Sequence, residues 1–304
     1  MSPQDIEIPV DTGVLAVRDH GGVGQPLILV HTPGWSLELW TPLAELLTDQ
    51  FHVYSFDLRR HGHSTAVHLP ACTAWHDLET ISYYFNLGPA ILLGHDMGAF
   101  LACVAAIKRP DLFTSVIGVD AAATLTRREV IKTYSTITDP EFHAGLNTRF
   151  TLDTKLPSKQ HVETWAEKQL DRYRKDWTLK GFNEDAMRAD IDRTIRLHPD
   201  GTFRTAASIE EILALYTFTL ANEVFPSVDL YEKLPCPSLT IHCRTGLHSE
   251  SHQRLLKLMT QHPFMEVVTI NAGHMAIHSS SRDISTLVKE FASEVYSAKV
   301  LCFS

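Results

Sequence analysis

One short segment constrains the fold of this chain more than any other. Residues 91–100 read ILLGHDMGAF, in which an apolar run leads into Gly94-His95-Asp96-Met97-Gly98 and then into an alanine-rich stretch. Two glycines four residues apart with a polar residue midway between them, placed between a strand and a helix, are typical of a tight turn that lifts the central side chain clear of the backbone. Serine is the usual central residue of such turns, whereas this chain has Asp96. The segment predicts strand, turn and helix, and it makes Asp96 a candidate nucleophile.

The segments around this turn alternate between strand and helix patterns. Apolar alternation predicts an opening hairpin, and four apolar runs predict further strands; the six segments are IEIPV, GVLAVRD, PLILVH, FHVYSFD, AILLG and SVIGVD. Helical patterns run from about Trp75 to Phe85 and from Ala99 to Lys108, before Arg109-Pro110. This alternation predicts an α/β fold with a mostly parallel sheet and helices on both faces.

The alternation stops after residue 123. Residues 124–228 are polar, helical in tendency and poor in strand signals, as in SKQHVETWAEKQLDRYRKDW and IEEILALYTFTLANEV. Core patterns return with PSLTIHC, HQRLLKLM, MEVVTI and DISTLVKEFASEVY. We therefore predict a core made of residues 1–123 and 229–304, with a helical lid, residues 124–228, inserted after the sixth strand. Insertions of this size commonly cover a site on the sheet.

The composition argues against several kinds of partner. The 304 residues carry a formal net charge of −9 and no basic cluster with interleaved aromatics, which speaks against nucleic acid and anionic membranes. No apolar run reaches the ~20 residues that span a bilayer, and the first residues lack a signal-peptide pattern. The five cysteines are scattered, which favours reduced thiols. We expect a cytoplasmic protein without a metal or another cofactor, and we leave open a homodimer.

Three polar residues directly follow predicted core strands. Asp96 follows ILLGH, Asp120 ends SVIGVD, and His274 lies in NAGHM after MEVVTI. The carboxyl ends of parallel strands meet at one edge of a sheet, where the ligand sites of such folds lie. A histidine beside a nucleophile activates it or a water molecule, and a second carboxylate orients that histidine. We predict that Asp96, His274 and Asp120 form a triad, although Asp120 also suits the N-cap of a helix.

Together these features resemble the α/β-hydrolase superfamily over nearly the full chain. The resemblance rests on His31-Thr32-Pro33-Gly34 after a strand, RRHGHS at 59–64, GHDMG, and Gly273-His274. An aspartate at the elbow is similar to the epoxide hydrolases and to the haloalkane and fluoroacetate dehalogenases. The resemblance implies that Asp96 attacks carbon to form an alkyl-enzyme ester, which water activated by His274 then hydrolyses. A carboxylate suits this chemistry because it is ionised at neutral pH without a base.

The resemblance leaves two positions for the acid of the triad. Many members of the superfamily place it after the seventh strand, where this chain reads HCRTGLHSES and offers only Glu250, several residues late. Asp120 resembles the acid of members that place it after the sixth strand. We favour Asp120 over Glu250.

The donors to developing negative charge depart from the usual pattern. Met97 can supply one backbone N–H at the start of its helix. The second N–H is expected from the turn after His31, but Pro33 has none. We expect the Thr32 hydroxyl, Gly34 or Trp35 to replace it, or the reaction to need less help of this kind than ester hydrolysis does.

The residue after Asp96 separates the candidate reactions further. Met97 stands where the haloalkane dehalogenases carry tryptophan and the fluoroacetate dehalogenases arginine, so the epoxide hydrolases remain the leading resemblance. Those enzymes use lid tyrosines to protonate the opening oxygen, since an alkoxide leaves poorly without a donor. Tyr216 is the first candidate donor and Tyr134 the second; either is alternatively a packed aromatic. The expected substrate is a small apolar organic molecule.

Other functions stay open at this point. A His274–Asp120 pair is a competent general base by itself, with Asp96 as acid, base or electrostatic group, as in lyases, isomerases, cyclases or cofactor-free oxygenases of this fold. Ester hydrolysis ranks lower because Asp96 replaces the serine it requires. A silent ligand-binding protein or receptor would need no triad, so the spacing of the three residues argues against it.

Overall fold

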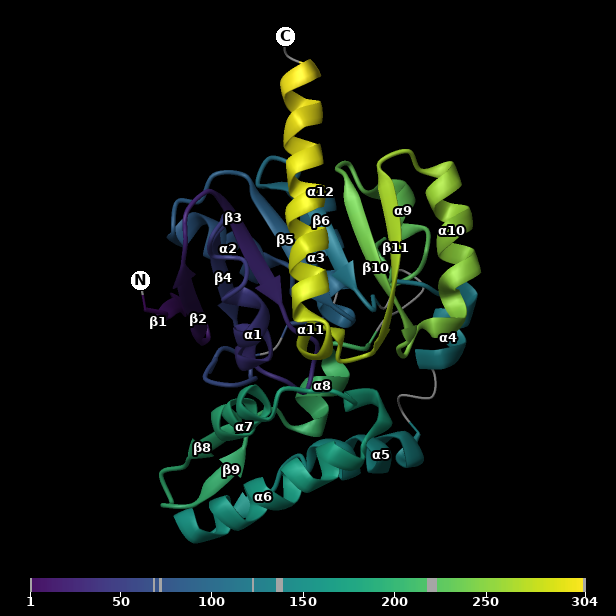
Figure 1. Ribbon diagram of the computed structural model, residues 1–304. Helices are drawn as coiled ribbons and strands as arrows, with labels where there is room; N and C mark the ends of the chain where they lie inside the picture. The colour runs from purple at the N-terminus through teal and green to yellow at the C-terminus, as the bar shows by residue number, and fades with distance from the viewer. Residues whose placement is uncertain are drawn as a thin grey trace.

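The computed structural model describes residues 2–67, 69–70, 73–121, 123–134, 139–217 and 223–302. Its centre is a twisted sheet of eight strands in the order β1-β2-β4-β3-β5-β6-β10-β11 (Figure 1). The strands are β1 (Gln4–Val10), β2 (Gly13–Gly21), β3 (Gln25–Val30), β4 (Phe51–Phe56), β5 (Ala90–His95), β6 (Phe113–Val119), β10 (Ser238–Thr245) and β11 (Met265–Gly273). The hairpin β1–β2 and the pair β2–β4 are antiparallel, and all other pairs of this sheet are parallel. The predicted α/β fold is confirmed.

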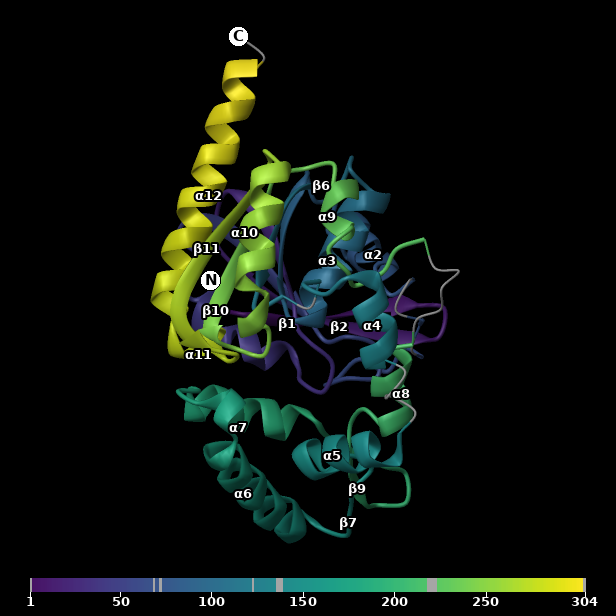
Figure 2. The ribbon, with the colours of Figure 1, turned by 90° about the vertical axis from the view of Figure 1, so that its right-hand side faces the viewer.

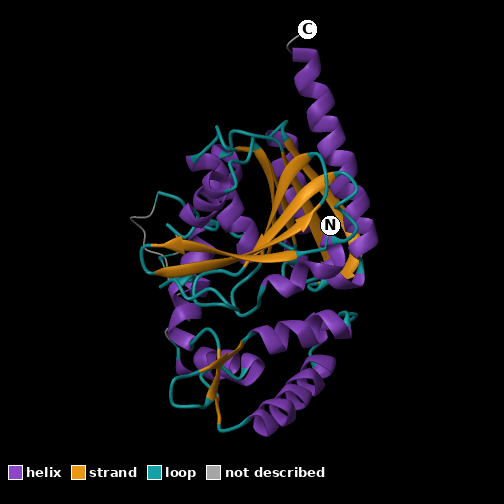
Figure 3. Cartoon of the chain, turned by 90° about the vertical axis from the view of Figure 1, so that its left-hand side faces the viewer, coloured by secondary structure: helices purple, strands orange, loops and turns teal. Residues whose placement is uncertain are grey.

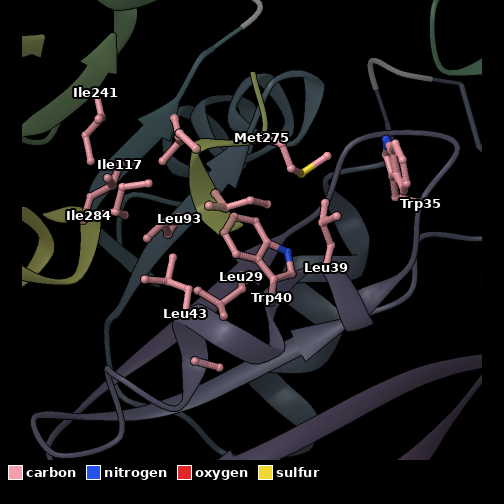
Figure 4. Close-up of a cluster of buried hydrophobic side chains, with 14 of the residues drawn as sticks. Leu29, Trp35, Leu39, Trp40, Leu43, Leu93, Ile117, Ile241, Met275 and Ile284 are labelled. Carbon is pink, nitrogen blue, oxygen red and sulfur yellow. The ribbon is translucent and has the colours of Figure 1, made fainter. Parts of the chain in front are cut away.

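Helices cover both faces of the sheet because its central strands are apolar on both sides. In β3, Ile28 and Val30 pack into one core, while Leu27 and Leu29 pack into the other. The first core is covered by α2 (His76–Tyr84), α3 (Met97–Lys108), α9 (Leu230–Lys233) and α10 (His252–Gln261). The second is covered by α1 (Thr41–Ala44), α11 (Ala276–Ser279) and α12 (Ser281–Cys302), and Figure 4 shows part of it around Trp40. This alternation fixes which side chains remain at the strand ends.

The described part of residues 124–228, here called the cap, leaves the sheet after β6 and returns before β10. It contains α4 (Arg127–Tyr134), α5 (Pro140–Phe150), α6 (Lys159–Lys175), α7 (Glu184–Arg193) and α8 (Ile209–Ala214), with the short helix η3 (Trp177–Leu179). Figures 1 and 2 show α5 to α8 as a separate layer next to one end of the sheet. The cap therefore faces the carboxyl ends of the parallel strands.

The cap also holds a small antiparallel sheet that the sequence did not predict. Its strands are β7 (Lys155–Leu156), β9 (Phe203–Thr205) and β8 (Ile195–Leu197), visible as thin arrows in Figure 3. Strands of two or three residues are too short to produce an alternating pattern. The helix expected over IEEILALYTFTLANEV is shorter than its pattern, because α8 ends at Ala214; residues 218–222 lie outside the described part.

No helix within the described ranges combines the length and the apolar character needed to cross a bilayer.

Candidate active site

Two glycines hold the turn that carries Asp96. β5 and α3 meet at Asp96, whose φ is 49° and whose ψ is −117°. A Cβ on Gly94 would lie 2.3 Å from the backbone nitrogen of Ala99, and a Cβ on Gly98 would lie 2.1 Å from the carbonyl oxygen of Val30. Only glycine fits these two positions, and the strained backbone of Asp96 projects its side chain from the end of the sheet.

Both carboxylate oxygens of Asp96 accept hydrogen bonds. The Thr32 hydroxyl donates to Oδ2 over 2.9 Å, and His248 Nε2 donates to Oδ1 over 3.0 Å. Burial alone would raise the pKa of Asp96, but the hydrogen bond and the charge of His248 outweigh it and hold the pKa below its ordinary value. Burial likewise opposes protonation of His248, yet its bond to Asp96 raises its pKa above the ordinary value. These directions favour an ion pair between carboxylate and imidazolium.

A second pair of side chains lies beside the first. His274, in the turn after β11, donates from Nδ1 to Asp120 Oδ2 over 2.7 Å. The backbone N–H of Leu247 donates to the same oxygen over 2.9 Å. Burial would raise the pKa of Asp120, but the bond from His274 and its charge lower it. Asp120 thus fixes the tautomer of His274, whose Nε2 can take a proton, and the His274 ring lines the cavity next to Asp96.

The surroundings of Asp120 explain why this carboxylate reaches the histidine. Asp120 has a φ of 41°, and a Cβ on Gly246 would lie 2.3 Å from its Oδ1. The loop after β10 therefore packs directly on the carboxylate only because residue 246 is glycine. Glu250, the alternative acid, is exposed in the short helix η4 (Ser249–Ser251). Asp120 does not cap a helix, since α4 begins only at Arg127.

His95, which precedes Asp96, supports the other histidine through its backbone. Its Nε2 donates to the carbonyl oxygen of His274 over 2.9 Å, and the two ring centroids are 4.5 Å apart. Burial lowers the pKa of His95 to about 3, so its ring stays neutral. A neutral ring on this side adds no positive charge beside His274.

The candidate donors to negative charge have different neighbours in the structure. Met97 begins α3 directly after Asp96, and its side chain is buried. The Thr32 hydroxyl is committed to Asp96 itself. Gly34, with a φ of +92°, makes a close approach, because a Cβ there would lie 2.9 Å from the ring of Phe150. Trp35 packs edge-on against the same ring at 5.4 Å, so Gly34 and Trp35 seat the end of α5 on the core.

A cavity of about 270 Å³ lies between the cap and the strand ends. Its polar lining includes Asp96, His248 and His274 from the core, with Arg149 and Tyr216 from the cap. Most of its remaining wall is apolar and comes from both layers: Trp35, Phe142, Leu146, Phe150, Ile212 and Leu247. Such a space suits a small, mainly apolar molecule whose reactive atom faces Asp96. Among the described residues, no group of three or more His, Cys, Asp or Glu side chains is arranged to hold a metal ion.

The two candidate tyrosines differ in what the structure describes. Tyr216, just after α8, lines the cavity and is hydrogen-bonded to Thr32. Burial and then the charge of Asp96 raise its pKa, so the phenol keeps its proton. The side chain of Tyr134 lies outside the described part of the chain. Tyr173, from α6, packs on Trp35 at 5.2 Å and is absent from the cavity wall.

The sequence profile of the alpha/beta hydrolase family matches residues 27–285, which is most of the chain. The chain belongs to the α/β-hydrolase family. Among solved structures, the fold is similar to that of E-2-(acetamidomethylene)succinate hydrolase, with a TM-score of 0.73 and 22% identity, over 96% of this chain and 100% of that one. At this level of sequence identity the similarity shows a shared fold and nothing about the reaction.

Curated relatives of this α/β hydrolase match over shorter segments. It is 39% identical to (E)-2-((N-methylformamido)methylene)succinate hydrolase of Acinetobacter baylyi over 95 residues, which cover 30% of this chain and 35% of that protein. It is 29% identical to the Karrikin insensitive 2 receptor CA of Petunia hybrida over 113 residues, which cover 35% of this chain and 42% of the receptor. The match therefore spans less than half of each of these relatives.

Sequence reasoning missed His248, and it also missed Arg149 of the cap, which lines the same cavity. His248 lies in HCRTGLHSES, where the resemblance predicts a carboxylate rather than a histidine. Because the chain contains seventeen histidines, the composition does not single out any one of them as a site residue. A local feature that could have indicated His248 is Gly246, two residues earlier, which packs on Asp120.

Proposed function

We propose that this α/β hydrolase opens a small apolar epoxide by covalent catalysis, with Asp96 as the nucleophile and the cap as the lid of the site. One observation carries the proposal: a carboxylate, in place of serine, projects from a strained turn into the cavity beside a histidine that another carboxylate orients. Serine would need that histidine for its own deprotonation. A carboxylate leaves the histidine available for the second step.

In the first step, an oxygen of Asp96 bonds to an epoxide carbon while the carbon–oxygen bond of the ring breaks. The electron pair passes to the ring oxygen, which takes a proton from a donor in the cavity. Each carboxylate oxygen has two lone-pair positions, so the bonds from Thr32 and His248 leave one on each for attack.

In the second step, His274 takes a proton from water through Nε2, and the water oxygen attacks the carbonyl carbon of the Asp96 ester. Asp120 stabilises the imidazolium that forms. The tetrahedral intermediate then collapses, and the diol oxygen leaves with the proton from His274. Asp96 is restored as a carboxylic acid, and its proton returns to the donor of the first step. The net reaction is the addition of one water to the epoxide.

A second candidate is general-base catalysis without a covalent intermediate. The observation that favours it is that both oxygens of Asp96 are already hydrogen-bonded, which makes the carboxylate a weaker nucleophile and a better electrostatic group. His274 and Asp120 would then act on substrate or water directly. This candidate includes the non-hydrolytic reactions of the fold.

Mass spectrometry of the His274→Gln variant separates the two candidates. Incubation with a panel of epoxides and alkyl halides should leave a stable adduct on the peptide that contains Asp96, since the ester forms but is not hydrolysed. The double variant Asp96→Asn, His274→Gln is the matched control and should form none. A folded His274→Gln protein that consumes or binds a panel member without an adduct would overturn the covalent proposal in favour of the second candidate.

A further inference from the structure

His248 has no task in the steps above, although it touches the reacting group. Its Nε2 lies 3.0 Å from Asp96 Oδ1, and the ring lines the cavity. The side chain is 20% exposed, so it reaches the space that a substrate would occupy. Its other nitrogen, Nδ1, lies 3.4 Å from the Thr124 hydroxyl. A histidine placed between the nucleophile and the cavity is in position to exchange a proton with both.

We propose that His248 is the proton donor of the ring-opening step, giving its Nε2 proton to the oxygen that leaves the attacked carbon. The inference rests on the proposed function, because it requires an ester on Asp96. It replaces Tyr216, which the resemblance favours, as the principal donor.

The timing of this transfer follows from where the negative charge lies. Before reaction, Asp96 is ionised and holds the proton on His248. When an Asp96 oxygen bonds to carbon, its charge passes to the departing oxygen, and the neutral ester no longer stabilises the imidazolium. Burial, which opposes the charged ring, then dominates, so the His248 proton becomes more acidic as the alkoxide forms.

The protons balance over the whole cycle. The first hydroxyl of the diol takes its proton from His248. In the hydrolysis, one proton of water passes through His274 to the second hydroxyl, and the other stays on the restored carboxyl of Asp96. That proton returns to His248 along the 3.0 Å hydrogen bond. The resting ion pair is thereby regenerated without another donor.

Other groups near His248 fit this assignment. The negative charge of Asp120 favours protonation of His248. Burial, as the largest cause, lowers the pKa of the nearby His242. His274 lines the same cavity, and its charge also lowers the pKa of Asp96. Tyr216 is the competing donor, but its pKa is raised and its hydroxyl is engaged with Thr32, so its proton is harder to release.

The first test follows the titration of His248 by NMR of labelled imidazoles. Asp96→Asn imitates the neutral ester at nearly the same shape, and the His248→Gln spectrum assigns the signal. The His248 midpoint should fall by at least about one pH unit in Asp96→Asn. A midpoint that does not move would overturn the inference, and this result needs no substrate.

The second test compares adduct formation in the His274→Gln background. Adding His248→Gln should slow the adduct from epoxides about 100-fold, as expected for loss of a general acid. The adduct from alkyl halides should not slow comparably, because halide leaves without a proton and the loss of the His248 hydrogen bond to the nucleophile acts on both substrate classes alike. Adding Tyr216→Phe should slow epoxides less, and His252→Gln, a nearby histidine outside the cavity wall, should change neither rate.

The outcomes distinguish the two proposals. An absent adduct with every substrate that the folded protein binds or consumes means that the proposed function fails. Equal loss with epoxides and halides, or none with epoxides, means that His248 is not the proton donor while covalent catalysis stands.

Discussion

Asp190 joins the cap to the core through a buried carboxylate, and its titration should set the pH dependence of stability. This residue of α7 is 1% exposed, and its Oδ1 accepts from the backbone N–H and the hydroxyl of Ser36, at 2.8 and 2.6 Å. Burial raises its pKa from 3.8 to about 7; the Ser36 bonds oppose this, and the charges of Asp57 and Glu38 add to it. The folded protein therefore holds a proton there that the unfolded chain loses near pH 4.

The sign and size of the effect follow from the two values. Because the folded value is the higher one, stability is fully present below pH about 4, falls as pH rises towards 7, and is constant above it. The folded and unfolded pKa values of Asp190 differ by about three pH units, and each unit is worth about 1.4 kcal/mol. The free energy of unfolding therefore falls by about 4 kcal/mol in total over the titration. About half of this decrease, about 2 kcal/mol, falls between about pH 5.5 and about pH 8.5.

The variant Asp190→Asn removes the titration while keeping an oxygen for Ser36. Its free energy of unfolding in urea, minus that of the wild type, should rise by about 2 kcal/mol from about pH 5.5 to about pH 8.5. Any constant cost of the amide cancels in this comparison. Asp192→Asn, at an exposed position of the same helix, is the matched control and should show no such rise. A difference for Asp190→Asn that stays flat with pH would refute the reasoning.

Two further substitutions test the turn after β3. Gly34→Ala should lower the free energy of unfolding in urea by about 1–3 kcal/mol, because a side chain at this positive φ is strained and its Cβ would meet the Phe150 ring. The control Gly145→Ala, in open space on α5, should be neutral or stabilising. Equal effects of the two substitutions would contradict the close approach at Gly34. Thr32→Val should lower kcat/KM about tenfold and shift the acidic limb of the pH profile of kcat/KM to higher pH, since losing this hydrogen-bond donor raises the pKa of Asp96. An acidic limb at the wild-type pH would show that the Thr32 hydroxyl does not stabilise the ionised carboxylate.

Much of the core was predictable because its signals are local. The strands around Asp96, and the helix after it, follow from apolar runs that end in turn residues. The convergence of Asp96, Asp120 and His274 was also predictable, since parallel strands bring their carboxyl ends to one edge. The structure brings all three together, as the triad predicts, although their catalytic roles remain a proposal.

The rest depends on contacts between segments that are distant in sequence. His248 reaches Asp96 through a loop whose course is set by packing on Asp120, 127 residues earlier than the loop's Leu247. The sequence makes Gly34 a candidate donor, whereas in the structure it leaves room for the ring of Phe150 from the cap. No pattern along the chain carries such information, because each contact exists only after segments that are distant in sequence have folded against one another.

The ring of Phe150 contributes both to the cavity wall and to the contact between the cap and the core. It lines the cavity, and it also packs against Gly34 and Trp35, where the cap meets the core. Selection for a bulkier substrate through this position would therefore also loosen the attachment of the cap. We expect lineages and laboratory libraries that enlarge the site here to need a compensating change at the junction, whereas enlargement at Leu146 or Phe142 carries no such linkage to the Gly34 contact.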